Sequence, residues 1–269
     1  MNSHEDAPVD GWGDRLGWGT AEARSASLAL YSPAQRQLLF AACADQFPQH
    51  QPLALSVVPA SLQPLTLCSD HFAVLYSPIS KTPLVVVERL NAALLCEAQA
   101  TTRTDQFYPD LRIPASGRAE LEDYRGQQPA VDCGHQAPAA DAPTPRAMAQ
   151  TFALSNMVPQ APESNRKAWS SVERATRKFA LRARGEVFVF TGPLFDPGHA
   201  TVGKGRVWKP TRLFKLVHDE SAGRAWAYVL PNAAAQVTKP IDYPTFVQQT
   251  GLPLLAGLPI TGSVRTASN

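Results

Sequence analysis

Three short segments of the chain carry residue types that could do chemistry together. They are residues 132–138 (Asp-Cys-Gly-His-Gln-Ala-Pro), residues 155–160 (Ser-Asn-Met-Val-Pro-Gln) and a set spaced four apart, Asn165, Trp169, Glu173 and Arg177. The neutral imidazole of His135 can take a proton from water near neutral pH if a second group fixes its tautomer. Gly134 has no side chain, so it would let the backbone approach a ligand closely.

Residues four apart lie along one side of a helix, so Asn165, Glu173 and Arg177 would form a polar strip. An amide, a carboxylate and a guanidinium in a row can hold a hard cation and a phosphate together. Each residue also has a plain structural interpretation. A lone histidine is more often structural, an asparagine at a helix start is more often a cap, and Glu173 with Arg177 can be a surface pair worth ~0.3–0.5 kcal/mol.

The clearest helix that could carry this strip is 164–184. Its apolar stripe at helical spacing consists of Trp169, Val172, Thr176, Phe179 and Ala183, and Ser164 can cap its start while Gly185 ends it. Shorter helices are predicted at 34–47, 143–150 and 243–250, the last ended by Gly251. Strands are predicted at 72–76, 84–88, 186–191, 212–218 and 224–230, the first two as a hairpin, and 99–131 is a long irregular connection. These elements predict an α+β fold with a largely antiparallel sheet.

Composition narrows the class of protein. The 269 residues carry 25 Lys+Arg against 23 Asp+Glu, a net charge of +2, with 44% hydrophobic residues and 24 prolines. That is enough apolar material for a core, and the prolines argue against a helical bundle. No apolar run reaches the ~18–20 residues of a membrane span. Residues 165–184 hold seven bases and one acid, which indicates either a localised anionic partner or a solvated helix face.

The four cysteines do not suggest a thiolate zinc site, because no C-x-x-C spacing occurs. Cys43 and Cys68 bracket a proline-rich stretch and could form a disulfide, which would indicate an oxidising compartment. Two buried free thiols are the alternative. Residues 1–20 show no signal-peptide pattern, so we expect that an exported form would have lost its signal.

Taken together and in this order, the three segments closely resemble the DNA/RNA non-specific endonucleases, the ββα-metal or His-Me finger family of Serratia nuclease. That family has Asp-Arg-Gly-His-x-Ala-Pro, then Ser-Asn-x-x-Pro-Gln, then Asn-x-x-x-Trp-x-x-x-Glu. Further matches are Thr191-Gly192-Pro193, Val207–Lys215, Tyr228–Asn232 and Thr250-Gly251, so the resemblance covers about residues 71–259. It implies the ββα-metal nuclease fold, a central antiparallel sheet flanked by helices, and cleavage of DNA and RNA to 5′-phosphorylated products.

The resemblance also implies roles for single residues. His135 is similar to the family's general base, Asn165 to its protein ligand for one Mg²⁺ (with Mn²⁺ as a substitute), and Glu173 to the carboxylate that holds the ion's water ligands. Arg177 resembles the arginine that clamps the phosphate, and Arg103 resembles the upstream phosphate-binding arginine, with Arg112 as its competitor. The supporting residues would be Asp132, Cys133, Gly134, Asn156 and Trp169.

Cys133 departs from the family pattern, which has arginine between the aspartate and the glycine. A thiol supplies neither five donors nor a fixed positive charge. Three interpretations stay open: a natural variant of altered activity, an engineered substitution, or a disulfide with Cys96. The chain is accordingly interpreted as an active metal-dependent endonuclease, and the alternative is a nucleic-acid-binding pseudo-nuclease with weak or no catalysis.

The expected organisation is an N-terminal arm (1–65), an endonuclease domain (66–262) and a C-terminal tail (263–269). The expected partners are DNA and RNA as substrates, with no membrane. The resemblance allows a monomer or a homodimer, and an immunity protein or inhibitor as a further partner. With the family's habit of secretion, the expected location is extracytoplasmic, either periplasmic or secreted.

Overall fold

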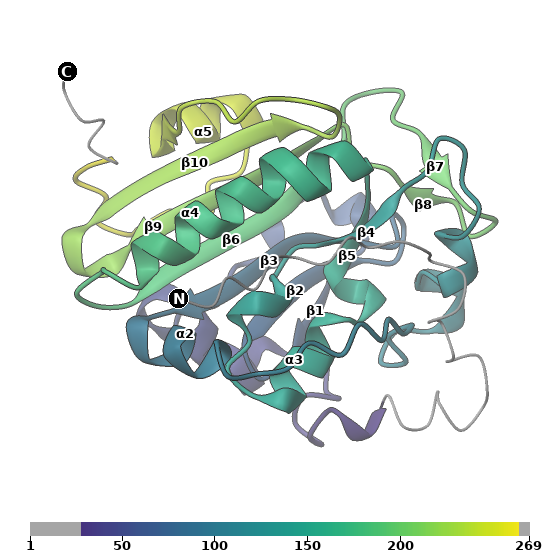
Figure 1. Ribbon diagram of the computed structural model, residues 1–269, viewed down its shortest axis with the longest axis horizontal. Helices are drawn as coiled ribbons and strands as arrows, with labels where there is room; N and C mark the ends of the chain where they lie inside the picture. Colours follow the sequence, from purple (N-terminus) through teal and green to yellow (C-terminus); the bar gives the residue numbers. More distant parts are fainter. Residues whose placement is uncertain (1–27, 264–269) are drawn as a thin grey trace, which may run out of the picture.

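A seven-stranded antiparallel sheet forms the centre of the computed structural model, which describes residues 28–263 (Figure 1). The strand order is β1-β2-β3-β6-β9-β10-β11. The strands are β1 (Leu65–Cys68), β2 (Phe72–Ser77), β3 (Thr82–Leu90), β6 (Val187–Leu194), β9 (Arg212–Asp219), β10 (Arg224–Pro231) and β11 (Ile241–Asp242). The central strands are buried on both faces, which explains their nearly continuous apolar runs.

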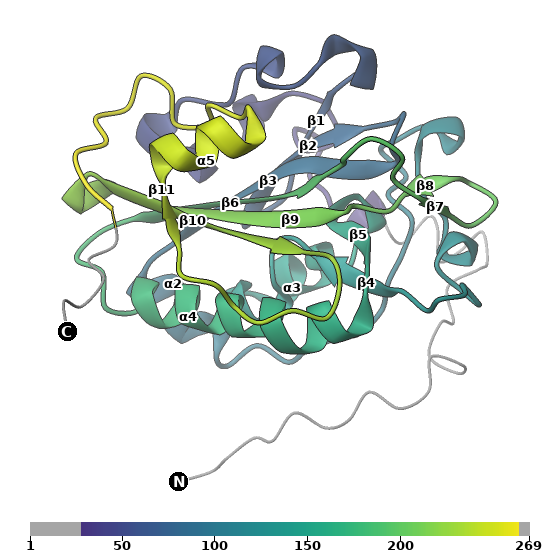
Figure 2. The same ribbon diagram turned by 90° about the horizontal axis from the view of Figure 1, so that it is seen from above.

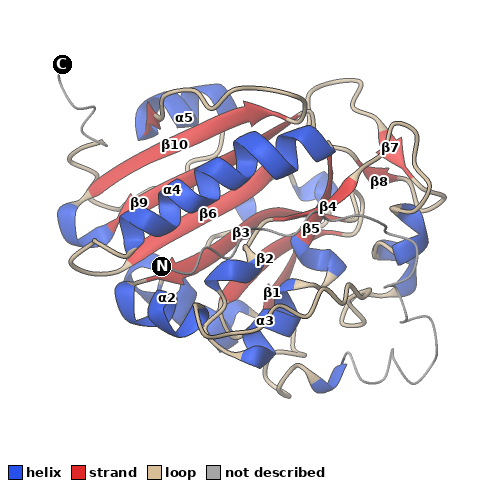
Figure 3. Cartoon of the chain, viewed as in Figure 1, coloured by secondary structure: helices blue, strands red, loops and turns tan. Residues whose placement is uncertain are grey.

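Helices and short hairpins cover both faces of the sheet (Figures 2 and 3). One face carries α2 (Ala92–Ala98), α3 (Pro145–Thr151), α4 (Ser170–Ala180) and the hairpin of β4 (Asp132–His135) with β5 (Met157–Gln160). The other face carries α5 (Tyr243–Thr250) and the N-terminal 3₁₀ turns. A small hairpin of β7 (Thr201–Val202) and β8 (Val207–Trp208) lies beside β4 and β5 in both views.

Short helical turns fill the connections. The 3₁₀ turns are η1 (Phe40–Gln46), η2 (Pro48–His50), η3 (Leu55–Val57), η4 (Ala60–Leu62), η5 (Ala115–Gly117), η6 (Leu121–Asp123), η7 (Ala139–Asp141), η8 (Leu154–Asn156) and η10 (Glu220–Ala222), and η9 (Ser164–Trp169) is a π-helical turn. The connection 99–131 contains only η5 and η6, so its predicted irregularity is confirmed. The predicted helix 34–47 is confirmed only at η1, where Cys43 departs from helical angles.

Most of the predicted strands and helices are confirmed, including the hairpin β2–β3 and the helix α5, which Gly251 ends at φ 70°. The predicted boundaries of the long helix are wrong. The helix already begins two residues before Ser164, whose hydroxyl lies 3.4 Å from Nε2 of Gln160 and caps nothing. At the other end α4 stops at Ala180, well before Gly185. Residues 164–169 form the π turn η9, a type of turn that is frequent at functional sites.

The segment 40–62 packs on the sheet. A disulfide joins Cys43 of η1 to Cys68 of β1, so the predicted pairing is confirmed. Phe40, Phe47 and Val58 lie in one apolar cluster with Phe246 of α5. Cys96 is exposed and Cys133 is buried, and both are free, so the alternative disulfide between them is wrong.

Two terminal stretches of the predicted organisation, 1–27 of the arm and 264–269 of the tail, lie outside the described residues. Within the described part, no helix combines the length and the apolar character that crossing a bilayer requires.

Candidate active site

The β4–β5 hairpin places His135 at the end of a short strand, opposite Met157. Gly134 has no room for a side chain, because a Cβ there would lie 2.2 Å from Oε1 of Gln160. Asn156 is fully buried and fixes the chain after His135. Its Oδ1 accepts from the backbone N–H of Ala137 (2.9 Å), and its Nδ2 donates to the carbonyl of Ala137 (3.0 Å). Asn156 therefore positions the loop that follows His135.

The imidazole of His135 is held by aromatic rings. The ring centroid lies 4.9 Å from that of Phe152, edge to face, and 5.8 Å from that of Phe107. Its Nε2 is buried and has no hydrogen-bond partner among residues 28–263, whereas the side chain as a whole is half-buried. Burial, and then the positive charge of Arg103, lower the pKa of His135 well below its usual value. The imidazole is therefore neutral at pH 7, and Nδ1 is the nitrogen that can face water.

Asp132 ties the start of β4 to the π turn η9. Its Oδ2 accepts from Nδ2 of Asn165 (3.0 Å) and from Nε of Arg166 (3.0 Å), and its Oδ1 accepts from Nη2 of Arg166 (2.8 Å). Since Asp132 engages Nδ2 of Asn165, Oδ1 is the atom of that amide which could act as an oxygen ligand. His135 is only three residues farther along β4, or roughly 10 Å of strand.

The two candidate arginines of the loop 99–131 lie in different environments. Arg112 is buried, pairs with Asp110 at 2.6 Å and 2.9 Å, and stacks on the ring of Tyr31 at 3.7 Å. Arg103 is 54% exposed and lies 5.3 Å above the ring of Phe152. The charge of Arg103 acts on both His135 and Glu173. Arg103 thus lies at the site, whereas Arg112 is part of the core.

Glu173 and Arg177 face a buried charged cluster. Arg177 donates from Nε to Oδ1 of Asp141. Burial, with the nearby Asp141, raises the pKa of Glu173 to about 7, although Lys215 and Arg177 act in the opposite direction. The carboxyl group is therefore part protonated at neutral pH, and a cation near it would ionise it fully.

A buried pair of opposite charges, Lys215 and Glu88, lies beneath this cluster and was not identified from the sequence. Lys215 of β9 and Glu88 of β3 are 1% and 2% exposed, and their charged atoms lie 3.9 Å apart. Nζ of Lys215 donates to Oγ1 of Thr191 (2.7 Å) and lies 5.6 Å from the ring of Trp169, which is fully buried. The sequence does offer a signal for this pair, because each of the two residues is a charged residue inside an apolar strand run, Val-Val-Val-Glu-Arg-Leu and Leu-Phe-Lys-Leu.

The oxygen atoms of Asn165 and Glu173 suit a hard cation. Mg²⁺ prefers oxygen ligands and keeps most of its water, so one amide oxygen, with a carboxylate eight residues farther along the same helix, is a fitting donor set. No group of three or more His, Cys, Asp and Glu side chains in residues 28–263 could hold a metal. Two oxygen donors thus fit a hydrated hard cation better than zinc, whose structural sites use nitrogen and sulfur ligands.

Cys133 lies on the same side of β4 as His135, because side chains alternate along a strand. It is 5% exposed and packs in an apolar cluster that includes Tyr124, Phe152 and Met157. Burial raises the pKa of its thiol, so Cys133 brings no charge to the site.

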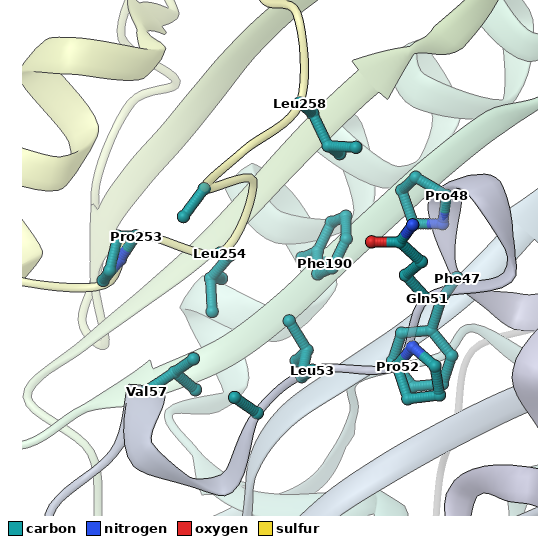
Figure 4. A pocket seen from close by; sticks show the side chains of 12 residues that line it. Phe47, Pro48, Gln51, Pro52, Leu53, Val57, Phe190, Pro253, Leu254 and Leu258 are labelled. Atoms are coloured by element: carbon teal, nitrogen blue, oxygen red, sulfur yellow. The ribbon is translucent and has the colours of Figure 1, made fainter.

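A cavity of about 200 Å³ lies on the opposite face of the sheet, between the N-terminal turns and the segment 253–258 (Figure 4). Its lining is Phe47, Pro48, Gln51, Pro52, Leu53, Ala54, Val57, Phe190, Pro253, Leu254, Ala256 and Leu258. No titratable side chain lines it, so this cavity offers no group for acid–base chemistry.

Comparison with known proteins points to one nuclease family. The model of the DNA/RNA non-specific endonuclease family matches residues 49–256. Human "Endonuclease G, mitochondrial" is 34% identical over 187 residues, which are 64% of this chain and 62% of that protein. "Nuclease C1" of Cunninghamella echinulata is also 34% identical over 187 residues, 64% of this chain and 73% of that one. The "Mitochondrial nuclease" of Saccharomyces cerevisiae is 31% identical over 217 residues, 71% and 65% of the two chains.

A solved structure is similar as well. The structure titled "Crystal structure of the EndoG/EndoGI complex: Mechanism of EndoG inhibition" superposes with a TM-score of 0.67 and 26% identity, covering 74% of this chain and 89% of that one. The chain thus has the α+β fold of EndoG with its large antiparallel sheet, although it spans only about three-fifths of the Endonuclease G proteins it matches. With its sequence matched from residue 49 to residue 256, this protein belongs to the DNA/RNA non-specific endonuclease family.

Proposed function

We propose that this protein is a Mg²⁺-dependent endonuclease that hydrolyses phosphodiester bonds in DNA and RNA and leaves 5′-phosphates. One observation carries the proposal: the neutral, part-exposed imidazole of His135 shares a β4 strand with Asp132, which orients Asn165. A proton acceptor and an oxygen ligand are thus fixed to one rigid hairpin–helix unit.

In this mechanism His135 takes the proton of the attacking water at Nδ1, because its low pKa keeps it unprotonated. Asn165 would bind the ion directly through Oδ1, and Glu173 would hold the ion's water ligands; when bound, Mg²⁺ would stabilise the charge that develops on the leaving oxygen. Arg103 and Arg177 orient the phosphate through charge-assisted hydrogen bonds. Contacts to phosphate carry no sequence information, so the sugar and the base would matter little.

The outer face of α4 and the turn after it support an anionic substrate. Arg174, Lys178, Arg182 and Arg184 are all exposed. Arg174 bonds to the hydroxyls of Ser170 and Ser171. In the described part of the chain, none of the four cations has a carboxylate partner. These unneutralised charges lie on the helix that carries Glu173 and Arg177 and on the turn after it, and we propose that they attract the phosphate backbone.

A second candidate function is a pseudo-nuclease that binds nucleic acid without cleaving it. The uncharged, buried Cys133 favours it, because the family pattern has arginine there.

Plasmid nicking and RNA degradation, each with Mg²⁺ and with EDTA, separate the two. We expect cleavage of both substrates with Mg²⁺ only, and at least ~10²-fold less with His135→Ala, the scale of general base catalysis. His50→Ala, which removes an exposed histidine, is the matched control. Salt-sensitive binding without Mg²⁺-dependent cleavage at high protein concentration would establish the pseudo-nuclease instead.

The proposal extends to location and partners. The disulfide between Cys43 and Cys68 supports an oxidising, extracytoplasmic compartment, although two of the three relatives compared above carry "mitochondrial" in their names. The EndoG structure describes an inhibited complex, so an inhibitory protein is proposed as a partner here too. Light scattering distinguishes a monomer from a homodimer.

A further inference from the structure

The β7–β8 hairpin shares its core with the candidate active site. Its inward residues Val202 and Val207 are buried in the apolar cluster that also holds Cys133 and Phe152, the residue against which His135 packs. Strand alternation then turns Trp208 outward. The hairpin lies beside β4 and β5 in two perpendicular views (Figures 1 and 2).

The tip of this hairpin, residues 203–206 (Gly-Lys-Gly-Arg), is fixed through its backbone. Gly205 donates its N–H to Oδ1 of Asp123 (2.6 Å). A Cβ on Gly203 or Gly205 would lie 2.3 Å or 2.4 Å from atoms of Asp123, so only glycine fits at both positions. The main chain is thereby held against η6, while the side chains of Lys204 and Arg206 remain exposed.

Neither of these two cations pairs with a carboxylate among residues 28–263. Arg206 also has φ 57°, in the left-handed region that side chains rarely adopt. The hairpin therefore presents two unneutralised positive charges in a strained, rigid turn.

Three half-buried rings lie at the base of the hairpin. The ring centroids of Trp208 and His199 are 4.2 Å apart, and that of Phe195 lies 5.3 Å from each. Trp208 is held by its backbone N–H, which donates to the carbonyl of Ser80 (2.9 Å). A part-exposed indole, packed against an imidazole and backed by a fixed strand, is a ready platform for another flat ring.

We propose that the β7–β8 hairpin binds an unpaired stretch of the nucleic acid, with a base stacked on Trp208 and His199 and the neighbouring phosphates on Lys204 and Arg206. This inference rests on the proposed function, and it adds a preference for single-stranded segments next to the cleaved bond. A base offers its face to an aromatic side chain only when it is unstacked, and cations beside aromatic rings are the combination that single-strand binding uses.

Binding measured in EDTA tests the inference without cleavage. Fluorescence anisotropy gives Kd for a labelled 12-nucleotide strand and for its duplex. Stacking of one base is worth ~1–3 kcal/mol, so Trp208→Ala should weaken single-strand binding by about tenfold and duplex binding by less than twofold. Trp208→Phe keeps a ring and should restore most of the affinity.

The salt dependence of binding tests the two positive charges of the hairpin separately. Replacing Lys204 and Arg206 together by glutamine should reduce the slope of log Kd against log salt for the single strand by about 1.4, since each phosphate contact contributes ~0.7. Lys239→Gln, at an exposed lysine outside the hairpin, is the control and should leave the slope unchanged. Thermal melting checks that each variant is folded.

The outcomes separate this inference from the proposed function. If the unaltered protein cleaves nucleic acid but Trp208→Ala leaves single-strand affinity within twofold, or weakens both strands equally, only the hairpin assignment is overturned. An unchanged salt slope in the Lys204 and Arg206 variant overturns it as well. If the unaltered protein neither binds nor cleaves nucleic acid, the proposed function itself fails.

Discussion

Removing the ammonium group of Lys215 should destabilise the fold strongly. Lys215 and Glu88 are almost completely buried, 3.9 Å apart, between the sheet and α4. Loss of one partner of a buried pair leaves the other charge uncompensated and costs about 3–5 kcal/mol. We therefore expect Lys215→Met to lower the free energy of unfolding by about that amount. Lys239→Met, at an exposed lysine, should change it by less than ~0.5 kcal/mol.

The loss of stability caused by Lys215→Met should depend on pH. Burial raises the pKa of Glu88 well above its usual value, and Lys215 acts against that rise. Without Lys215 the pKa of Glu88 rises further, so the carboxyl group takes a proton in the folded state. A raised carboxyl pKa contributes stability that is complete below the unfolded value of ~4.3 and is lost as the pH rises through the folded value. The variant should therefore be less impaired at pH 5 than at pH 8.

Urea unfolding at both pH values, in EDTA, measures these differences. The double variant Glu88→Gln with Lys215→Met should recover part of the loss, because it leaves no buried charge unpaired. A loss below ~1 kcal/mol, equal losses at pH 5 and pH 8, or strictly additive effects of the two substitutions would each refute the reasoning.

Three further predictions concern the ligand, the charged helix face and the disulfide. Asn165→Ala should raise the Mg²⁺ concentration for half-maximal cleavage at least ~10-fold while oligonucleotide binding in EDTA stays within twofold; an unchanged Mg²⁺ dependence argues against Asn165 as ligand. Lys178→Gln should lower the salt slope of duplex binding by ~0.9, whereas an effect no larger than that of Lys239→Gln would remove α4 from the substrate path. Reducing the disulfide between Cys43 and Cys68, 25 residues apart, should cost about 3 kcal/mol in urea unfolding, and a smaller loss than ~1 kcal/mol would count against its structural role.

The main sheet could be predicted because its strands have simple patterns. β2, β3, β6, β9 and β10 are apolar runs between turn residues, and this signal is local. β4 and β5 were missed because each has four residues and contains Gly134 or Pro159, which lower strand propensity. The helix boundary at Ser164 failed for a different reason: the helix already begins at Pro162, in the first-turn position that proline favours, and runs on into the π turn.

The sequence names the residues of the candidate site but not the contacts among them. The spacing of Asn165 and Glu173 is visible in the sequence, whereas the bond from Asn165 to Asp132 depends on how β4 meets the helix. The buried pair Glu88 and Lys215 also lies 127 residues apart in sequence, and only the register of the sheet brings it under Trp169.

The buried position of Cys133 affects which residue can bring a positive charge to the phosphate. An arginine at this position would extend from β4 into an apolar cluster with Phe152 and Met157, where an unpaired guanidinium is costly. The charge must therefore come from another residue. Nε of Arg177 is engaged with Asp141. Arg103 is 54% exposed, pairs with the part-exposed Asp105 and lies over the ring of Phe152, which packs against His135. Because the pKa of His135 is lowered chiefly by burial, the base does not need an arginine at position 133. In the proposed mechanism, Arg103 therefore makes the main phosphate contact and Arg177 assists it.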